Sequence, residues 1–525
     1  MKEIVAPRAG RREWIGLAVL ILPTLLIAMD LTVLHLAVPA LSRDLAPTSS
    51  QLLWIVDIYG FFIAGSLITM GTLGDRIGRR KLLLIGAGAF GLASILAAFA
   101  PSPETLIAAR ALLGIAGATL MPSTMSLIRN MFHDSTQRTT AIGIWISGFS
   151  AGSAIGPLLG GWLLERFWWG SVFLLNVPVM VLLLVLGPLL LPEFRDSRPG
   201  RFDLLSAAQS LLAVLLVIFG LKGIAESGVG PLSAVSIVAG LIIGALFIRR
   251  QLTLASPLLD LNLFRNRIFS AALSTNTIIV FFQFGLFLYT AQYLQLVLGL
   301  TPLQAGLWTL PGAVTFIIGS NLVPKVVSVI RPAVIVTTGL LVVAAGSGLL
   351  TQVGAAAGLT TLVIASVVTS LGFSLVVTVT VDLILAAAPP ERAGAASAIS
   401  ETGFELGGAL GIAIMGSIGT AVYRSTVAGT IPSGVPLPAV TATHETLGGA
   451  IAAATELPAP LGAALAAAAR EAFVQGFHLI ALIGTVAAVG MAVVAMTLLR
   501  RAGAEVEPTS LPTAGEAPVE IKPAA

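Results

Sequence analysis

Fourteen stretches of this chain are each apolar over about 20 residues, the length of an α-helix that crosses a bilayer. Hydrophobic residues make up 56% of the 525 residues and charged residues only 10%, whereas about a quarter of the residues in soluble domains are charged. The runs are about twice as long as a barrel strand of ~10 residues and lack its polar alternation. The sequence therefore predicts an all-α polytopic membrane protein. We expect transmembrane helices near residues 15–38, 52–73, 81–100, 105–128, 140–164, 171–191, 204–222, 231–248, 268–293, 303–323, 333–350, 358–385, 394–422 and 474–499.

The segments between the spans alternate in positive charge, and Lys/Arg-rich segments are typically cytoplasmic. Most of the 29 basic residues fall in the set that includes both termini, so we expect both termini in the cytoplasm. A cleaved signal peptide is the alternative for the basic start, but the apolar run that follows is longer than an h-region and contains Asp30. Arg110 is then the one basic residue expected within a span. The opposite set of segments holds only Arg43, Arg166, Lys222, Arg424 and Arg470.

Several classes of function are excluded by what the sequence lacks. The absence of cysteine rules out disulfides, thiolate nucleophiles and Cys-ligated metals. The four histidines are far apart and show no metal-ligand spacing, so we expect neither metal nor cofactor. No nucleophile and base set or phosphate-cradling loop is visible, which argues against an enzyme. The mild basic excess reflects membrane topology, and no nucleic-acid partner is expected.

An internal repeat suggests two halves. The pattern Gly-Phe-x-x-Gly-x-x-x-Gly occurs at 148–156 and again at 403–411. If the two helices are equivalent, the halves form a parallel repeat, as in transporters that bind substrate near the midplane between rocking halves. The predicted parts are a cytoplasmic N-terminus (1–14), a six-helix half (15–192), two inserted helices (203–250), a second six-helix half (268–500) with an outer loop (424–473), and a disordered cytoplasmic tail (501–525).

The outer loop contains two Ala-rich stretches, near 446–455 and 460–472, which are too short to span a membrane. We expect them to form a helical hairpin on the external face. The sequence does not decide between a lid and a passive surface feature as the role of this hairpin.

Four carboxylates lie deep within predicted spans, namely Asp30, Asp57, Glu401 and Glu405, whereas Asp382 lies near the cytoplasmic end of its span. A carboxylate at the bilayer centre costs on the order of 2.5 kcal/mol or more, so such residues usually mark a substrate or proton path. Asp30 is expected to pair with Arg110. That pair is either a structural ion pair or a switch in which a proton on Asp30 releases Arg110.

Trp54, Asp57 and Phe61 have the spacing i, i+3, i+7 and share one face of a helix. A carboxylate between two aromatic rings suits a lipophilic cation, because charge attraction is joined by a cation–π contact worth ~0.5–2 kcal/mol. The alternative for Trp54 is a place in the interfacial aromatic belt. An interfacial aromatic belt accounts for the ring of Trp54 but does not account for the carboxylate of Asp57.

Glu401 and Glu405 are four residues apart and share a helix face, while Gly403, Gly407 and Gly411 lie on the opposite face. The glycines allow close packing on a neighbouring helix. The two acids repel each other in a low dielectric, which favours protonation of at least one of them. A salt-bridged structural pair is the alternative, but the last six predicted spans contain no basic residue that could neutralise them.

Five motifs follow one another along the chain: Asp30-Leu-Thr-Val-Leu-His-Leu-Ala-Val-Pro39, Leu53-Trp54-Ile-Val-Asp57-Ile-Tyr59, Gly71-x-x-x-Asp75-Arg76-x-Gly78-Arg79-Arg80, Arg110-x-x-x-Gly114 with Gly152-x-x-x-Gly156-Pro157-x-x-Gly160-Gly161, and Glu401-Thr-Gly-Phe-Glu405-Leu-Gly. In the same order, they resemble motifs of the major facilitator superfamily, and specifically of the fourteen-span drug/proton antiporters of the QacA/SmvA type. The resemblance covers roughly residues 14–500.

The resemblance implies a fold of two six-helix halves plus two inserted helices, and it implies roles for individual residues. Asp75 could also cap a helix start, basic residues such as Arg79 could simply anchor topology, and the glycines around Pro157 could serve helix packing alone. The implied roles are proton coupling by Asp30, Arg110 and Glu405; substrate binding by Asp57, Glu401, Trp54, Tyr59, Phe61 and Phe404; a conformational gate at Gly71, Asp75, Arg76, Gly78 and Arg79; and an antiporter glycine stripe at Gly152, Gly156, Pro157 and Gly160.

The expected function is proton-coupled efflux of lipophilic cations such as quaternary ammonium compounds, dyes and viologens. We expect a monomer in the inner (plasma) membrane whose partners are these small cations, protons and the lipid bilayer. A cation-binding sensor on the same scaffold is one alternative. An exporter of another metabolite is the second, although a single intramembrane Arg among four acids disfavours anionic substrates.

Overall fold

The computed structural model contains helices and loops only, and no strand occurs among the residues that it describes. Fourteen of the described helical segments are long and apolar enough to cross a membrane. The predicted fold class is therefore confirmed. The expected tail 501–525 lies outside the described residues. The structure describes residues 8–195, 203–254, 257–327, 329–355, 358–388 and 393–499.

The helices of the first half and of the insert are α1 (Arg11–Leu45), α2 (Ser49–Ile77), α3 (Arg79–Ala98), α4 (Pro103–Met131), α5 (Ser135–Arg166), α6 (Ser171–Leu174), α7 (Asn176–Leu190), α8 (Leu204–Ser227) and α9 (Pro231–Thr253). Those of the second half are η1 (Leu263–Arg265), α10 (Arg267–Gln292), η2 (Tyr293–Val297), α11 (Pro302–Val327), α12 (Pro332–Leu350), α13 (Leu359–Ala386), α14 (Ala393–Ala428), α15 (Leu437–Glu445), α16 (Leu447–Thr455) and α17 (Ala459–Leu498).

Helix is the only regular structure that satisfies all backbone hydrogen bonds within a single span, which explains why the apolar runs fold this way. The sixth span is divided into α6 and α7 at Leu175. Pro178 follows three residues later and has no N–H to donate to the preceding turn. The break places Asn176 inside the bundle, where it donates to Ser94 Oγ at 3.2 Å.

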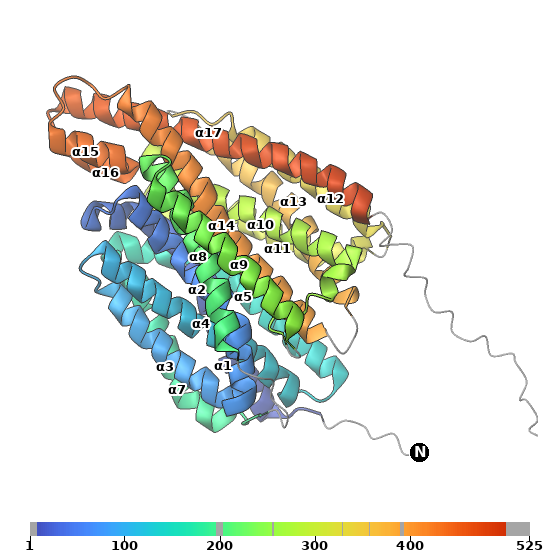
Figure 1. Ribbon diagram of the computed structural model, residues 1–525. Coiled ribbons are helices and arrows are strands. Elements are labelled where there is room, and N and C mark those ends of the chain that lie inside the picture. The colour runs from blue at the N-terminus through green and yellow to red at the C-terminus, as the bar shows by residue number, and fades with distance from the viewer. Residues whose placement is uncertain are drawn as a thin grey trace, which may run out of the picture.

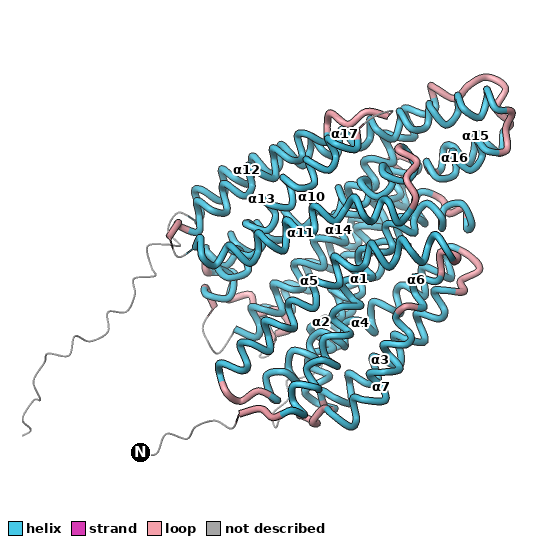
Figure 2. The backbone as a smooth tube through the Cα atoms, turned by 180° about the vertical axis from the view of Figure 1, so that it is seen from behind, coloured by secondary structure: helices cyan, strands magenta, loops and turns pink. Residues whose placement is uncertain are grey.

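The outer loop contains more helix than predicted. The two Ala-rich stretches are helical and pack on each other as expected, since α16 holds the first and a Cβ on Gly462 in the second would collide with the Ala454 carbonyl oxygen. In addition, α15 precedes α16 and pairs with it, and the second stretch (460–472) belongs to α17, which continues into the last span. No proline interrupts α17 after Pro460, and Ala is the best helix former, so nothing ends the helix between that stretch and the span. In Figures 1 and 2 the α15–α16 hairpin lies at one end of the bundle, which we call the hairpin side.

The glycine pattern that suggested a repeat performs the same packing in both halves. On α5, a Cβ added to Gly152 would stand 2.9 Å from Ala28 Cβ of α1. On α14, a Cβ added to Gly407 would stand 2.6 Å from the carbonyl oxygen of Thr277 on α10. Close approach of two helices requires such small residues. The pairs α1–α5 and α10–α14 are therefore built alike.

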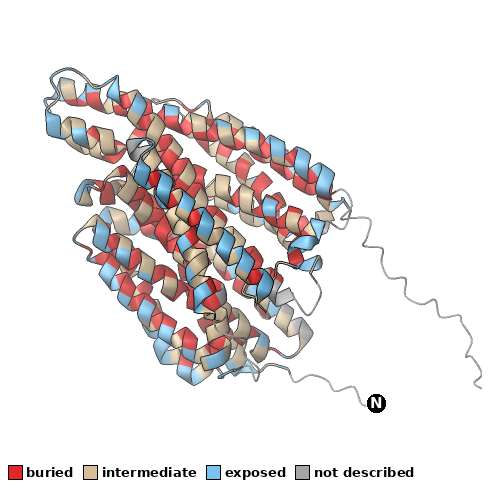
Figure 3. Ribbon diagram, in the orientation of Figure 1, coloured by how far each residue is buried: buried red, intermediate tan, exposed pale blue. Residues whose placement is uncertain are grey.

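The outward faces of the peripheral helices are exposed and apolar. Figure 3 shows exposed residues along α3, α9 and α17, and they include Leu92 on α3, Leu241 on α9 and Val486 on α17, each more than 60% exposed. A soluble protein avoids so large an apolar surface. These faces suit contact with lipid.

Several contacts between the two halves lie on the hairpin side. Gln295 donates to the Leu36 carbonyl oxygen at 3.1 Å, which joins η2 to α1. A Cβ on Gly161 of α5 would stand 2.6 Å from Leu303 Cα of α11. The start of α1 and the end of α17 lie away from the hairpin, and α8 and α9 run along one face over the seam between the halves (Figure 1). The inserted helices therefore border the place where a site between the halves must lie.

Candidate functional site

A buried ion pair joins α1 to α4. Arg110 Nη1 lies 2.5 Å from Asp30 Oδ2, and both side chains are almost fully shielded from solvent. Arg110 Nε also donates to the Ile55 carbonyl oxygen at 3.2 Å, and its guanidinium lies 4.5 Å from the centroid of the Tyr59 ring. The structure thus brings together two of the residues expected to couple protons, and Tyr59 connects them to α2.

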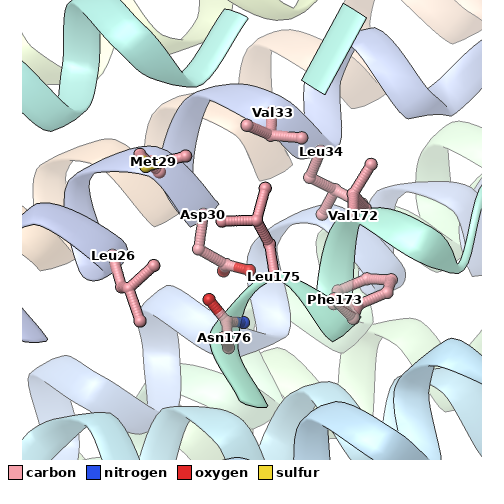
Figure 4. A pocket seen from close by; sticks show the side chains of 9 residues that line it. All are labelled: Leu26, Met29, Asp30, Val33, Leu34, Val172, Phe173, Leu175 and Asn176. Atoms are coloured by element: carbon pink, nitrogen blue, oxygen red, sulfur yellow. The ribbon is translucent and has the colours of Figure 1, made fainter. Parts of the chain in front are cut away.

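Asp30 borders a small cavity of ≈ 10 Å³, about the volume that a single water requires. Figure 4 shows Asp30 and Asn176 directed into this cavity, which is otherwise lined by apolar side chains such as Phe173 and Leu26. The break between α6 and α7 supplies Asn176. The cavity thus leaves a space of about the size of one water molecule next to the carboxylate.

Asp57 is paired with a residue that the sequence analysis placed in an outer loop. Lys222 lies within α8, and its Nζ is 2.8 Å from Asp57 Oδ2, with both side chains at most 1% exposed. The prediction that Arg110 is the single basic residue within a span is therefore wrong. The lysine was misassigned because it stands at the predicted end of a span and beside a glycine, where a loop was equally plausible.

An aromatic ring completes this second pair. Lys222 Nζ lies 3.9 Å from the centroid of the Trp54 ring, which places the ammonium over its face. The Trp54 and Phe61 rings are 6.5 Å apart in an edge-on arrangement. Trp54, Asp57 and Phe61 therefore gather on one side of α2 as their spacing predicted, and they face the inserted helix α8.

The surroundings of the pair are apolar. Phe61 of α2 packs in one buried cluster with Ile218 of α8 and with Ala409 and Ala413 of α14. Placing two charges in such an environment costs several kcal/mol per ion, which mutual attraction only partly offsets. Neither side chain of the Asp57–Lys222 pair has a further hydrogen-bond partner among the described residues.

Glu401 and Glu405 lie on α14, beside α2. A Cβ on Gly60 of α2 would stand 3.8 Å from the Glu405 carbonyl oxygen and 3.1 Å from Ala409 Cβ, so the two helices touch at this level. Glu405 is buried and Glu401 is partly buried. Neither side chain has an ion pair or hydrogen bond within the described part of the chain. Of the four acids deep within the spans, Asp30 and Asp57 have a buried cation, while Glu401 and Glu405 have none among the described residues.

The remaining predicted binding residues lie around these acids. Phe404 makes an edge-on contact with Phe284 of α10 at 5.8 Å between ring centroids. Tyr59 is buried within electrostatic range of Asp30, Arg110 and Glu405. It therefore lies between the ion pair of the first half and the acids of the second.

The predicted gate lies at the end of the bundle away from the hairpin. Asp75 forms an ion pair with Arg79 one turn later, so it does not cap the start of α3 as the sequence analysis allowed. Glu193, which follows α7, instead accepts from the backbone N–H groups of Arg80 and Lys81 at 3.1 and 3.2 Å. Gly78 has a φ of 111°, and a Cβ there would collide with the Glu193 carboxylate.

Gly71 and Arg76 lie in the last two turns of α2, so this part of the predicted gate is helical. Gly71 is partly buried, and a Cβ there would stand 3.9 Å from Pro122 of α4. Arg76 is exposed. The predicted gate thus packs within the first half, next to α4 and to the segment that follows α7.

The glycine stripe on α5 serves two contacts. Cβ atoms on Gly156 and Gly160 would stand 3.2 Å from Met29 Cα and 2.5 Å from Val33 of α1, so the stripe packs on the helix that carries Asp30. Pro157 contacts Gly306 of α11, in the other half. The same motif thus positions α1 and joins the halves on the hairpin side.

A polar contact between the halves lies beneath the hairpin, and sequence reasoning missed it. Glu445, at the end of α15, accepts from the Ser49 backbone N–H at 3.1 Å and lies 2.8 Å from Arg424 Nη2. It therefore ties the start of α2 to α14. A cavity of ≈ 40 Å³, lined by residues of both halves including Leu53, lies next to this contact.

No group of three or more His, Cys, Asp or Glu side chains among the described residues could hold a metal ion.

The residues that sequence reasoning missed are Lys222, Glu193 and Glu445. The only signal for Lys222 was the requirement that the buried Asp57 be neutralised.

Comparison with known proteins agrees with this architecture. The family described as Major Facilitator Superfamily matches residues 20–412. The multidrug efflux pump LfrA of Mycolicibacterium smegmatis is 45% identical over 494 residues, which covers 94% of this chain and 98% of that protein. The methyl viologen resistance protein SmvA of Salmonella typhimurium is 36% identical and covers 90% and 95%. The tetracenomycin C resistance and export protein of Streptomyces glaucescens is 30% identical and covers 93% and 92%.

Solved structures show the same fold at low sequence identity. The crystal structure of a bacterial homologue of the human lysosomal transporter Spinster superposes with a TM-score of 0.66 at 17% identity, covering 94% of this chain and 98% of that chain. A POT family transporter in complex with a thioalcohol-conjugated peptide superposes with a TM-score of 0.61 at 13% identity, covering 94% of this chain and 97% of that chain.

Proposed function

Because this chain belongs to the major facilitator superfamily and is a multidrug efflux transporter rather than an enzyme, we propose that it exports lipophilic cations in exchange for protons by alternating access. The substrate class proposed is quaternary ammonium compounds, cationic dyes and viologens. The relative from Salmonella typhimurium, named for methyl viologen resistance, supports this class.

The observation that carries the proposal is the pair of acids without a counter-ion on α14. Glu401 and Glu405 face no basic side chain in the described part of the chain and lie where α14 touches α2. Carboxylates in a low dielectric are satisfied by a proton or by a cation. Protons and drug therefore compete for the same groups, and this competition is the coupling.

Asp30 and Arg110 form the proposed switch in the first half. When Asp30 is ionised, it holds Arg110 at 2.5 Å. A proton on Asp30 would remove this attraction and free Arg110 to change its contacts with α2, where it now donates to the Ile55 carbonyl oxygen. The small cavity at Asp30 supports this role because it gives the carboxylate a neighbouring space for water.

The remaining elements control from which side of the membrane the site can be reached. We assign the hairpin side to the outside and both termini to the cytoplasm of a cell whose plasma (inner) membrane holds the protein as a monomer. Contacts such as Gln295 to Leu36 then close the outer side. The glycine stripe and Pro157 keep that seal, and the Gly71–Arg79 segment at the junction of α2 and α3 gates the inner side. Each charge that crosses 100 mV contributes ~2.3 kcal/mol, so inward proton movement can sustain a drug gradient.

The experiment is ethidium efflux from cells that express the protein, with and without an uncoupler. We expect wild-type efflux to stop with the uncoupler, and Glu405→Gln to lose the uncoupler-sensitive part. Glu456→Gln is the matched control, since Glu456 is exposed on the hairpin side. Full uncoupler-sensitive efflux by both Glu405→Gln and Asp30→Asn would overturn the assigned roles, and uncoupler-resistant efflux by the wild type would overturn proton coupling.

A further inference from the structure

The protein supplies its own cation to the site that a drug cation should occupy. The ammonium of Lys222 lies 2.8 Å from the Asp57 carboxylate and 3.9 Å from the centroid of the Trp54 ring. A carboxylate on one side and an aromatic face on the other is the recognition geometry for an organic ammonium ion. The only difference is that this ammonium is tethered to α8.

Extending its ammonium to the membrane interface would cost Lys222 less free energy than burial in the bundle. It stands five residues before the end of α8 at Ser227, or about 8 Å along the helix axis. A lysine this close to a helix end normally extends its stem so that its ammonium reaches the membrane interface. Lys222 instead points into the bundle and is 2% exposed. The Asp57–Trp54 site therefore holds it, and a route outward for its ammonium is short.

Two glycines set α8 in the position that directs Lys222 inward. Cβ atoms on Gly220 and Gly223 would stand 2.6 Å from the Ser233 carbonyl oxygen and 2.6 Å from Ser233 Oγ of α9. The glycine side of α8 is therefore pressed against α9, and the Lys222 side faces α2. At the other end of α8, Leu211 packs on Gly65 of α2.

The level of the Asp57–Lys222 pair along the contact between α2 and α14 determines when an exported cation would meet it. Gly60 of α2 is level with Ala409 of α14, and Gly416 of α14 contacts Leu53 of α2. Asp57 therefore lies closer to the hairpin side than Glu405 does. A cation that first meets the acids of α14 finds the next carboxylate already occupied.

We propose that Lys222 is a tethered competitor of the exported cation. Its ammonium occupies the Asp57–Trp54 site while no drug is bound, and it leaves towards the membrane interface when a monovalent aromatic or quaternary cation enters. This inference rests on the proposed function, because it names a residue that sets the specificity of the same transport route.

The exchange has a consequence for selectivity. A monovalent drug that replaces Lys222 leaves the charge of the site unchanged, so its gain over the lysine comes from its larger apolar and aromatic surface. Small hydrophilic amines offer no such gain and do not displace the tethered ammonium. Lys222 thereby restricts the site to lipophilic cations.

The first test measures equilibrium binding of tetraphenylphosphonium to the purified full-length protein. Lys222→Met removes the competing charge at similar side-chain length. We expect it to bind tetraphenylphosphonium at least about tenfold more tightly than the wild type, because the drug no longer has to displace an ammonium from the Asp57 carboxylate; tenfold corresponds to about 1.4 kcal/mol. Folded Lys222→Met protein that binds no more tightly than the wild type would overturn the proposal.

Three further variants control for other effects. Lys222→Arg keeps the charge and should bind close to the wild-type affinity. Asp57→Asn combined with Lys222→Met removes both charges and should lose the gain. Arg249→Met removes one positive charge at an exposed position of the neighbouring helix α9 and should change nothing. A gain in Arg249→Met equal to that in Lys222→Met would reduce the effect to net charge and would also overturn the proposal.

A second test uses the wild-type chain and does not depend on whether a variant folds. An amine-acylating reagent followed by peptide mass spectrometry reports the reactivity of Lys222, with Lys81 as internal reference. We expect Lys222 to be protected in the free protein and to react several-fold faster with saturating tetraphenylphosphonium. Unchanged reactivity in the presence of bound tetraphenylphosphonium would contradict the proposal.

The experiments distinguish a failure of the proposed cation export from a failure of the proposed role of Lys222. If the wild type neither binds tetraphenylphosphonium nor exports ethidium, the proposed cation export is wrong and this inference falls with it. If the wild type exports ethidium and Asp57→Asn impairs it, but Lys222→Met gains no affinity, then only the role of Lys222 is refuted.

Discussion

Asp30 on α1 and Arg110 on α4 are each other's only ion-pair partners in the described part of the chain, 2.5 Å apart and almost wholly buried. Neither residue can lose its partner without leaving a charge in an apolar environment. This dependence is the reason why we propose the pair as a switch that responds to a single proton.

Asp30→Asn should therefore both destabilise the protein and stop coupled efflux. Removing one partner of a buried pair leaves the other charge uncompensated, which costs about 3–5 kcal/mol. Heat unfolding in detergent measures the first effect, and uncoupler-sensitive ethidium efflux measures the second. Asp44→Asn breaks the exposed Arg43–Asp44 pair at the end of the same helix, where a change within about 1 kcal/mol is expected. Equal effects of the two substitutions would contradict this account.

Gly152→Ala should weaken the packing of α5 on α1. The added methyl group would stand 2.9 Å from Ala28 Cβ and closer still to the Leu25 carbonyl oxygen, and overpacking of this kind costs about 1–3 kcal/mol. Gly143→Ala on the same helix is the control, because no atom lies within 4 Å of a Cβ there. We expect a lower unfolding temperature for Gly152→Ala only. A lower temperature for both variants would mean that helix glycines matter for reasons other than contact.

Glu445→Gln should loosen the seal under the hairpin. It removes the charge that holds Arg424 at 2.8 Å and weakens the bond from the Ser49 N–H across the two halves. The chain has no cysteine, so a single Leu53→Cys reporter in the nearby cavity can be followed with a membrane-impermeant maleimide. Labelling should be several-fold faster with Glu445→Gln than with the exposed control Glu456→Gln. Identical rates would show that the contact does not restrict opening.

Glu193→Gln should destabilise the start of α3. Its carboxylate accepts from the Arg80 and Lys81 N–H groups and lies 3.7 Å from Arg80 Nε, so it serves as a helix N-cap supplied from another part of the chain. Loss of a capping acceptor costs about 0.5–2 kcal/mol. Thermal unfolding in detergent is the measurement, and Glu165→Gln at an exposed position is the control. An unchanged midpoint for Glu193→Gln would refute the capping role.

Sequence patterns were sufficient to predict the features that depend on a single segment of the chain. Apolar length predicts each span because lipid requires a self-contained helix, and the three-to-four-residue spacing places Trp54, Asp57 and Phe61 on one face regardless of what surrounds α2. The pairing of Asp30 with Arg110 could also be anticipated, since an intramembrane acid requires a partner and Arg110 was the available one.

Partners that come from distant segments could not be anticipated in this way. Glu193 reaches α3 from beyond α7, and Glu445 reaches Ser49 from the last part of the chain. Which helix face meets which neighbour depends on how the helices pack, and no periodicity within one segment carries that information.

The fourteen spans, the repeated halves and the four intramembrane acids were thus determined by the sequence alone, because hydrophobic length and the cost of buried charge act on each segment separately. Only the tertiary structure decided that Asp57 already holds a cation while Glu401 and Glu405 have none among the residues that the structure describes. That outcome depends on the inserted helix α8 lying over the seam between α2 and α14, where packing brings Lys222 within contact of one acid and leaves the other two without a counter-ion.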